Sequence, residues 1–294
     1  MKRILLTGGS GFIGRNIRES FLARKYEILS PAHAELDVFD DESVETFFRK
    51  NAVDYVIHAA TKPGHRNAKD PTNLFYANTR MFFNLARFSD QYEKMLVLGS
   101  GAIYDNRAYH HAMREVEWKD HLPLDEHGFC KYVCTEAIEH KENITDLRIF
   151  GIFGRYEDYS IRFISNMICK ALFGLPLTMN QDRLFSYLFI DDLMPILDLM
   201  LERSLRFKSY NIVPDETCSL YNLAEMVKTK IDDMLPIFAA KPGRGSEYTG
   251  DNSRLKAEFA NLVFTPMTDA VDLLIEYYNK NIECIQRHLL EVDK

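Results

Sequence analysis

The sequence has no long apolar run and no cluster of positive charge. Its 294 residues include 36 Lys and Arg against 43 Asp and Glu, which gives a formal net charge of −7. Without a basic tract, a role in binding nucleic acid has little support. Every apolar stretch is far shorter than the roughly 20 residues of a membrane-spanning helix, so we expect no membrane span. No signal peptide precedes the first predicted strand, which favours a cytoplasmic location.

Cysteine is scarce, and no Cys-x-x-Cys pair occurs among the five cysteines. Their odd number and their position in regular segments favour reduced thiols packed as small apolar residues. Cys130 and Cys134 lie one helical turn apart, and we interpret them as packed thiols rather than as a redox pair. Because His110, His111 and His121 lack a Cys or carboxylate at a familiar ligand spacing, we predict no metal site.

The sequence does contain a glycine-rich turn near its N-terminus. The apolar run of residues 4–6 predicts a buried parallel strand, and three glycines follow at three-residue spacing. Glycine is needed where a chain turns tightly and a pyrophosphate approaches its backbone. The next helix would point unpaired N–H groups at the phosphates. The turn therefore predicts a dinucleotide site made by Gly8, Ser10, Gly11, Phe12, Ile13 and Gly14.

Beyond this turn, apolar runs alternate with helical patterns. This alternation predicts an α/β fold with a Rossmann-type, doubly wound parallel sheet. The predicted strands are 4–6, 26–29, 54–60, 95–98, 145–153, 186–190 and 210–213. The predicted helices are 13–24, 43–50, 71–90, 127–141, 162–173, 219–234 and 268–290. For the third helix, we expect Asp70 as the N-cap and Pro71 as the first helical residue.

The alternation loosens after residue 154, which predicts a second, smaller part of the chain. We expect residues 1–155 to form a dinucleotide-binding domain, to which 186–213 return. Residues 156–185 and 214–294 would form a smaller, C-terminal substrate-binding lobe that closes over the sheet edge.

The end of the second predicted strand bears on the choice of cofactor. NAD-binding enzymes usually carry an acid there to hold the ribose 2′-OH, but this sequence has none until Glu35. Its absence removes the usual repulsion against a 2′-phosphate, which His33 or Ser30 could contact, although no arginine is present. We therefore expect NADP, with NAD nearly as well supported. Asp37 and Val38 follow, and we expect them at the adenine.

Two further strands end in residues that suit a ligand site. Ala59 and Ala60 end the third strand and leave room for a cofactor, although small residues also serve helix–sheet packing. The next strand delivers Ser100 and Gly101 to the carboxyl edge of the sheet, where ligands bind in open α/β sheets.

With these residues in chain order, followed by Lys131, the sequence resembles the extended short-chain dehydrogenase/reductases. These include the nucleotide-sugar epimerases, dehydratases and 4-keto reductases, and the likeness runs over nearly the whole chain. Residues 98–104, Leu-Gly-Ser-Gly-Ala-Ile-Tyr, look closest to the GDP-fucose synthase branch. The resemblance implies a nicotinamide cofactor, a nucleotide-sugar substrate, and a homodimer formed through the helices at about 71–90 and 131–141.

The resemblance also implies catalytic roles. Ser100 would hydrogen-bond the sugar oxygen, and Lys131 would bind the nicotinamide ribose. The family's acid is a tyrosine four residues before the lysine, where this sequence has His127. An imidazole can exchange protons near pH ~6.5, but its ring is shorter than a phenol and a neighbouring lysine opposes its cation.

Three hypotheses about the acid–base step follow. His127 performs the step with adjusted geometry, or another group performs it, or the site binds its ligands with little turnover. The tyrosines near in sequence that could replace His127 are Tyr104, Tyr109 and Tyr132.

Cations that could bind the substrate occur in two regions, although a place on the solvated surface explains each of them as well. Lys62, His65 and Arg66 follow the third strand, where the family's substrate loop lies. Arg183 and Arg244, together with Lys241, fall where the family binds the nucleotide of the sugar, and phosphate recognition needs such cations. The sequence as a whole predicts a nicotinamide-dependent nucleotide-sugar 4-keto reductase or epimerase. The alternative is a catalytically impaired relative that binds a dinucleotide or a sugar.

Overall fold

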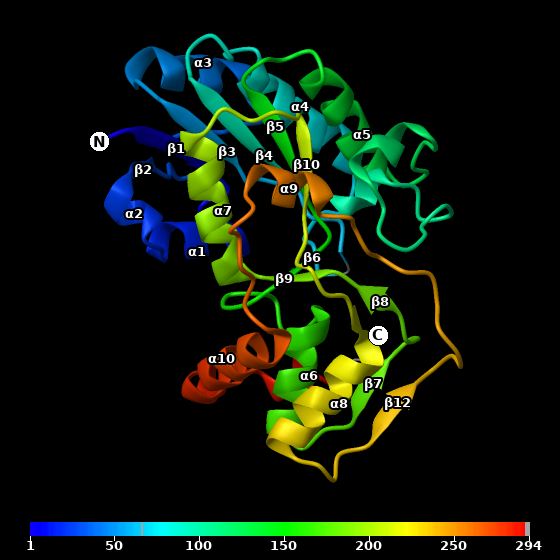
Figure 1. Cartoon of the computed structure of the whole chain (residues 1–294). Helices are drawn as coiled ribbons and strands as arrows, with labels where there is room; N and C mark the ends of the chain where they lie inside the picture. Colours follow the sequence, from blue (N-terminus) through cyan, green and yellow to red (C-terminus); the bar gives the residue numbers. More distant parts are fainter. Residues whose placement is uncertain (66, 292–294) are drawn as a thin grey trace.

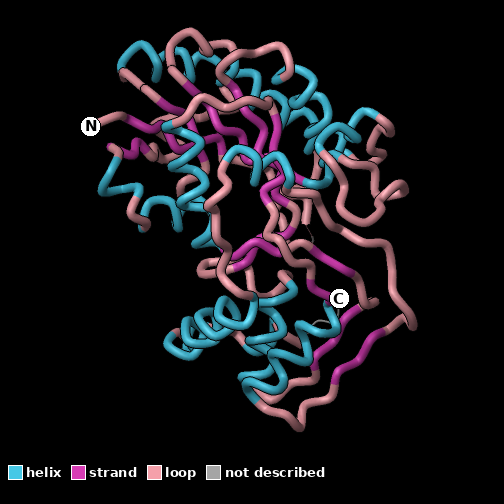
Figure 2. The backbone as a smooth tube through the Cα atoms, in the orientation of Figure 1, coloured by secondary structure: helices cyan, strands magenta, loops and turns pink. Residues whose placement is uncertain are grey.

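A six-stranded parallel sheet forms the centre of the computed structural model, which describes residues 1–65 and 67–291. The strand order is β10-β5-β4-β3-β1-β2 (Figures 1 and 2). These strands are β1 (Arg3–Thr7), β2 (Glu27–Leu29), β3 (Tyr55–His58), β4 (Lys94–Ser100), β5 (Ile144–Ile149) and β10 (Ser209–Ile212). All pairs are parallel, so the predicted Rossmann-type fold is confirmed.

Helices cover both faces of this sheet. They are α1 (Phe12–Glu19), α2 (Leu22–Lys25), α3 (Asp41–Lys50), α4 (Leu74–Ala86), α5 (Glu126–Ile138) and α7 (Ile190–Glu202). Successive side chains of a strand point to opposite faces. On β1, Ile4 and Leu6 accordingly belong to the core with α1 and α7, whereas Leu5 packs with α3, α4 and α5. Such a doubly covered sheet explains the continuous apolar runs of its strands.

A second group of elements lies below the sheet in Figure 1. Its helices are α6 (Phe163–Leu172), α8 (Leu220–Ile231) and α10 (Met267–Lys280). Three two-stranded sheets join it: β6 (Gly151–Phe153) with β9 (Tyr187–Phe189), β7 (Leu177–Met179) with β12 (Ile237–Ala239), and β8 (Leu184–Phe185) with β11 (Cys218–Ser219). After β12, the chain runs back to α9 (Ser253–Glu258), where Arg254 donates to the carbonyl of Ser209 on β10. The predicted lobe boundaries stay a prediction.

The helix predicted for 71–90 begins later than expected. Asp70 does not cap α4, because its carboxylate accepts a hydrogen bond from the backbone of Thr72 at 3.0 Å. Asn73 then adopts a left-handed conformation with φ 53°. This conformation is incompatible with a continuous right-handed helix, so Pro71 lies before α4 rather than in its first turn.

Three other predicted elements are interrupted or shortened. Ser20 breaks the helix of 13–24, because its backbone is extended and its hydroxyl donates to the carbonyl of Ile17. The strand of 145–153 divides at Phe150, where the chain leaves the large sheet to pair with β9. The helix of 268–290 ends at Lys280, and short 3₁₀ turns follow it.

Among the described residues, no helix combines the length and the apolar character that crossing a bilayer requires.

Candidate active site

A cavity of about 1160 Å³ opens at the carboxyl edge of the sheet. It is larger than the roughly 300–1,000 Å³ usual for small-molecule pockets, so it has room for more than one ligand. The cavity meets the sheet between β1 and β3, where the order of strands reverses and where such folds bind ligands. The predicted site residues that line it are Gly8, Ser10, Gly11, Phe12, Ile13, Gly14, His33, Asp37, Val38, Ala59, Ala60, Ser100, His127 and Lys131.

The glycine turn is too tightly packed for larger residues. Gly8 has φ +72°, and a Cβ on it would lie 2.6 Å from the backbone nitrogen of Ala60. A Cβ on Gly14 would lie 2.2 Å from the carbonyl oxygen of Gly8. The backbone of β1, the start of α1 and the end of β3 therefore meet at one point. This cradle fits a dinucleotide, whose pyrophosphate needs a close approach to backbone N–H groups.

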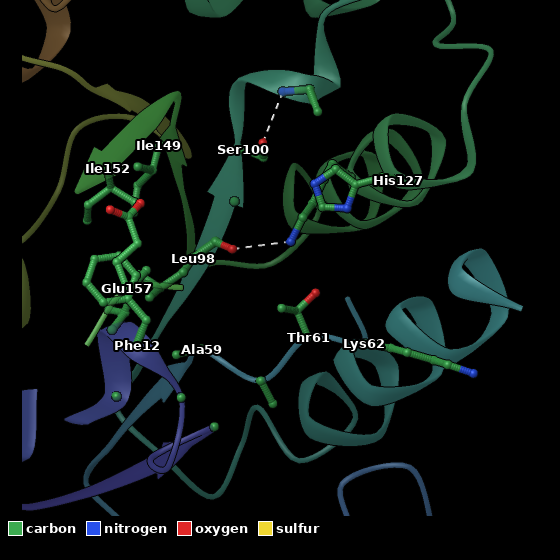
Figure 3. Close-up of a pocket in the computed structure, with 18 of the residues that line it drawn as sticks. Phe12, Ala59, Thr61, Lys62, Leu98, Ser100, His127, Ile149, Ile152 and Glu157 are labelled. Atoms are coloured by element: carbon green, nitrogen blue, oxygen red, sulfur yellow. Dashed lines mark hydrogen bonds between the residues drawn. The ribbon is translucent and has the colours of Figure 1, made fainter. Parts of the chain in front are cut away.

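Ser100 and His127 lie on the other side of the cavity (Figure 3), which Lys131 also lines. Ser100 ends β4, and its hydroxyl accepts a hydrogen bond from the backbone of Ala102 at 3.1 Å. His127 and Lys131 lie one turn apart on α5. The ammonium of Lys131 donates to the carbonyl of Leu98 at 3.2 Å, which directs this side chain to the end of β4.

The family described as "NAD dependent epimerase/dehydratase family" matches residues 4–213 of this sequence. The chain belongs to this family. The match includes the glycine turn, Ser100, His127 and Lys131, and it confirms the resemblance found in the sequence.

Two curated relatives are named as synthases of GDP-sugars. A GDP-L-colitose synthase of Yersinia pseudotuberculosis is 25% identical over 185 residues, which are 58% of this chain and 60% of that protein. A GDP-L-fucose synthase of Azorhizobium caulinodans is 33% identical over 107 residues, 35% of this chain and 34% of that protein. The matched parts thus span less than two thirds of either relative.

Solved structures share the fold over almost the whole chain. A GDP-L-fucose synthetase from Naegleria fowleri bound to NADP has a TM-score of 0.80 at 16% identity, covering 96% of this chain and 94% of that one. The GDP-mannoheptose C4 reductase MlghC from Campylobacter jejuni, with NADP bound, has a TM-score of 0.80 at 18% identity, covering 95% and 98%.

Within this cavity, His127 is a neutral group at neutral pH. Burial, and to a lesser extent the charges of Lys131 and Arg162, lower the pKa of its imidazole to about 4 against an opposing effect of Asp125. A neutral imidazole can accept a proton or hydrogen-bond a hydroxyl, but it is a poor proton donor. This favours a different group for the acid step.

The three tyrosines considered as replacements for His127 do not line the cavity. The hydroxyl of Tyr104 donates to the Asn211 side chain at 2.8 Å, and that of Tyr109 donates to the carbonyl of Gly101 at 3.0 Å. The ring of Tyr132 packs on Trp118, with centroids 4.8 Å apart. All three are therefore engaged outside the cavity.

Sequence reasoning missed a fourth tyrosine, Tyr248, which does line the cavity. Its hydroxyl lies 3.4 Å from the hydroxyl oxygen of Ser100. These two residues are 148 positions apart, and Tyr248 lies beyond the family match. No local pattern in the sequence could have connected them.

The cations predicted for the nucleotide of the sugar do not line this cavity. Arg183 donates to the Ser246 hydroxyl at 2.6 Å, and Arg244 is 3.4 Å from the carboxylate of Asp182. Gly101, the other residue expected to contact the substrate, is buried and is not among the lining residues. All three stay predictions.

Two other cations do line the cavity. One is Lys62 of the predicted substrate loop, whose ammonium pairs with Asp70 at 2.5 Å. The other is Arg162, which precedes α6 and was not predicted. Among the described residues, no carboxylate forms an ion pair with Arg162, so its guanidinium can meet an anionic ligand. His65 is not among the lining residues, and Arg66 lies outside the described residues.

The described residues include no cluster of metal ligands. Among the described residues, no group of three or more His, Cys, Asp and Glu is placed to hold a metal ion. The exposed His111 instead pairs with Glu247, at 2.8 Å.

Beneath the cavity, the buried His58 at the end of β3 shares a hydrogen bond of 2.8 Å with the Thr7 hydroxyl. Burial, and to a lesser extent the charge of Lys131, lowers the pKa of His58 to about 3. The unfolded chain therefore binds a proton at this residue from about pH 6.5 downward, whereas the folded chain does not.

We expect the free energy of unfolding to fall by about 2 kcal/mol through His58 alone between pH 7 and pH 5. Urea unfolding at a series of pH values measures this effect, and His58→Asn should flatten the pH dependence by that amount. Thr7→Val is the matched control, because it removes the same hydrogen bond but keeps the titrating ring, so it should lower stability without flattening the curve. An equal slope in His58→Asn and the wild type contradicts the assignment.

Proposed function

We propose that the protein is an NAD(P)-dependent nucleotide-sugar reductase or epimerase that acts at a 4-keto group or at C4 or C3 of the sugar. One observation carries this proposal: the glycine cradle opens into the same cavity as Ser100, His127 and Lys131. The printed names of the curated relatives support a nucleotide-sugar substrate.

Each residue has a role that its position supports. A bound nicotinamide cofactor would supply or accept the hydride. Ser100 hydrogen-bonds the sugar oxygen that reacts, and Lys131 binds the nicotinamide ribose. His127, as a neutral ring, hydrogen-bonds a sugar hydroxyl. Arg162 provides positive charge for the diphosphate of the substrate, a role in which arginine binds two oxygens at once.

The first experiment is a screen of nucleotide-sugars and their 4-keto forms with the purified protein, following NAD(P)H absorbance and product mass. We expect conversion of at least one nucleotide-sugar. Ser100→Ala and Lys131→Met should each lower kcat/KM by about 100-fold or more, as the loss of a positioned hydrogen bond or proton-transfer group does.

The rival function is binding of the same ligands without turnover. It is favoured by His127, which stands in the place of the family's tyrosine. Cofactor binding with no conversion across the screen would support this rival. Conversion that depends on Ser100 and Lys131 would exclude it.

We propose NADP rather than NAD as the preferred cofactor. Arg18 of α1 reaches the turn after β1, where its guanidinium donates to the carbonyl of Gly9 at 3.4 Å. Ser30, which follows β2, borders the same glycine. An arginine of α1 near a hydroxyl at the end of β2 suits a 2′-phosphate, and no acid follows β2 until Glu35.

Arg18→Gln should weaken NADPH binding by about tenfold while leaving NADH binding within about twofold, because only NADPH carries the 2′-phosphate. Titration of each cofactor by fluorescence measures both constants. Equal losses for the two cofactors would contradict the role of Arg18.

The helices α4 and α5 support a homodimer. They pack side by side, and Phe75 and Phe129 stack between them with centroids 5.1 Å apart. Tyr76 and Phe83 of α4 and Phe129 of α5 leave 55%, 43% and 38% of their surface exposed.

We expect a dimer by light scattering at micromolar concentration and a monomer after Phe83→Asp. A monomeric wild type would contradict the proposal.

A cytoplasmic location fits the cysteines, all five of which are free thiols.

A further inference from the structure

The phenol of Tyr248 lies beside Ser100 in the cavity and comes from a part of the chain beyond the family match. Tyr248 lies on the segment that returns from β12 to α9, and its hydroxyl is 3.4 Å from that of Ser100. A carbonyl oxygen bound beside Ser100 would be within reach of both hydroxyls. In this chain, His127 occupies the position where the family's acid is expected, so the step lacks its usual proton donor.

Tyr248 is held firmly in this position. Its backbone nitrogen donates to the carbonyl of Leu184 at 2.8 Å, and its carbonyl accepts from the backbone of Ser186 at 3.1 Å. Its ring contacts those of Tyr109, Phe150 and Phe185, at centroid distances of 5.3, 4.9 and 5.5 Å. A side chain fixed on both its backbone and its ring keeps its hydroxyl in place, as a catalytic group requires.

Burial keeps the phenol of Tyr248 protonated. Burial raises the pKa of Tyr248 to about 12 and Asp125 also raises it, while Ser100, Arg162 and Tyr109 lower it. The phenol is therefore protonated at neutral pH, when the His127 ring is already neutral. Ser100 and Arg162 would stabilise the phenolate that remains after the proton has left.

We propose that Tyr248 is the catalytic acid of this site, donating its hydroxyl proton to the sugar oxygen in the reduction. The inference rests on the function proposed above. As hydride from the reduced nicotinamide adds to the carbonyl carbon, the electron pair of the C=O bond moves to oxygen and takes the Tyr248 proton. The tyrosine O–H bond breaks, an alcohol forms, and the phenolate regains a proton from water.

Tyr248→Phe tests this assignment, because it removes only the hydroxyl. We expect kcat to fall by about 100-fold or more, the usual contribution of a general acid, with KM and the NADPH dissociation constant within about threefold. Tyr132→Phe is the matched control, since it makes the same change on a ring that does not line the cavity, and it should keep kcat within about twofold.

The contact between the hydroxyls of Tyr248 and Ser100 can be tested in the free protein, without cofactor or substrate. We would place 3-fluorotyrosine at position 248 and follow its ionisation by ¹⁹F NMR in the free protein. Because the Ser100 hydrogen bond lowers the pKa of this phenol, Ser100→Ala should raise it. An unchanged titration would overturn the contact on which the proposal depends.

The kinetic outcomes separate this proposal from the proposed function. If the wild type converts a nucleotide-sugar and Tyr248→Phe does so equally well, while His127→Gln is inactive, the acid is His127 and only the Tyr248 assignment falls. If the wild type converts nothing although it binds NADPH, the proposed function falls, and the role of Tyr248 as an acid falls with it.

Discussion

The fully buried guanidinium of Arg148 links the central sheet to the loop that precedes α5. The guanidinium of Arg148, on β5, pairs with Asp146 at 2.9 Å and donates to the Tyr104 hydroxyl at 3.0 Å and to the Glu115 carbonyl at 2.9 Å. A buried charge is tolerated only where such partners surround it, and removing one partner of a buried pair costs about 3–5 kcal/mol. The loop before α5 therefore has little freedom to rearrange.

The same network reaches the segment that carries Tyr248. Tyr104 donates to Asn211 of β10, whose side-chain amide donates to the carbonyls of Met113 and Asp251 at 2.8 and 3.0 Å. The backbone nitrogen of Met113 in turn donates to the carbonyl of Thr249. Polar groups that are not catalytic thus determine where a candidate catalytic hydroxyl lies.

The sequence predicted what depends on neighbouring residues and missed what depends on packing. The glycine turn, the end of β3 and Ser100 follow strands directly, so local patterns identified them, and the parallel sheet followed from alternation. Arg162 and Tyr248 carry no local signal, because the fold of the second group of elements brings them to the cavity. The start of α4 was misjudged for a related reason: Asn73 adopts a left-handed conformation, which composition does not encode.

The returning segment means that this protein is not modular. The family match ends at residue 213, yet Thr249 and Gly250 complete backbone pairs with Met113 on the sheet side of the molecule. A fragment cut at the end of the match would leave the Met113 backbone without its Thr249 and Asp251 partners, and it would remove one of the two carbonyls that the Asn211 amide binds. Replacing the C-terminal part of the chain with that of a relative would break the same contacts unless residues 249–251 were kept together with the sheet. The two parts must therefore change together in evolution.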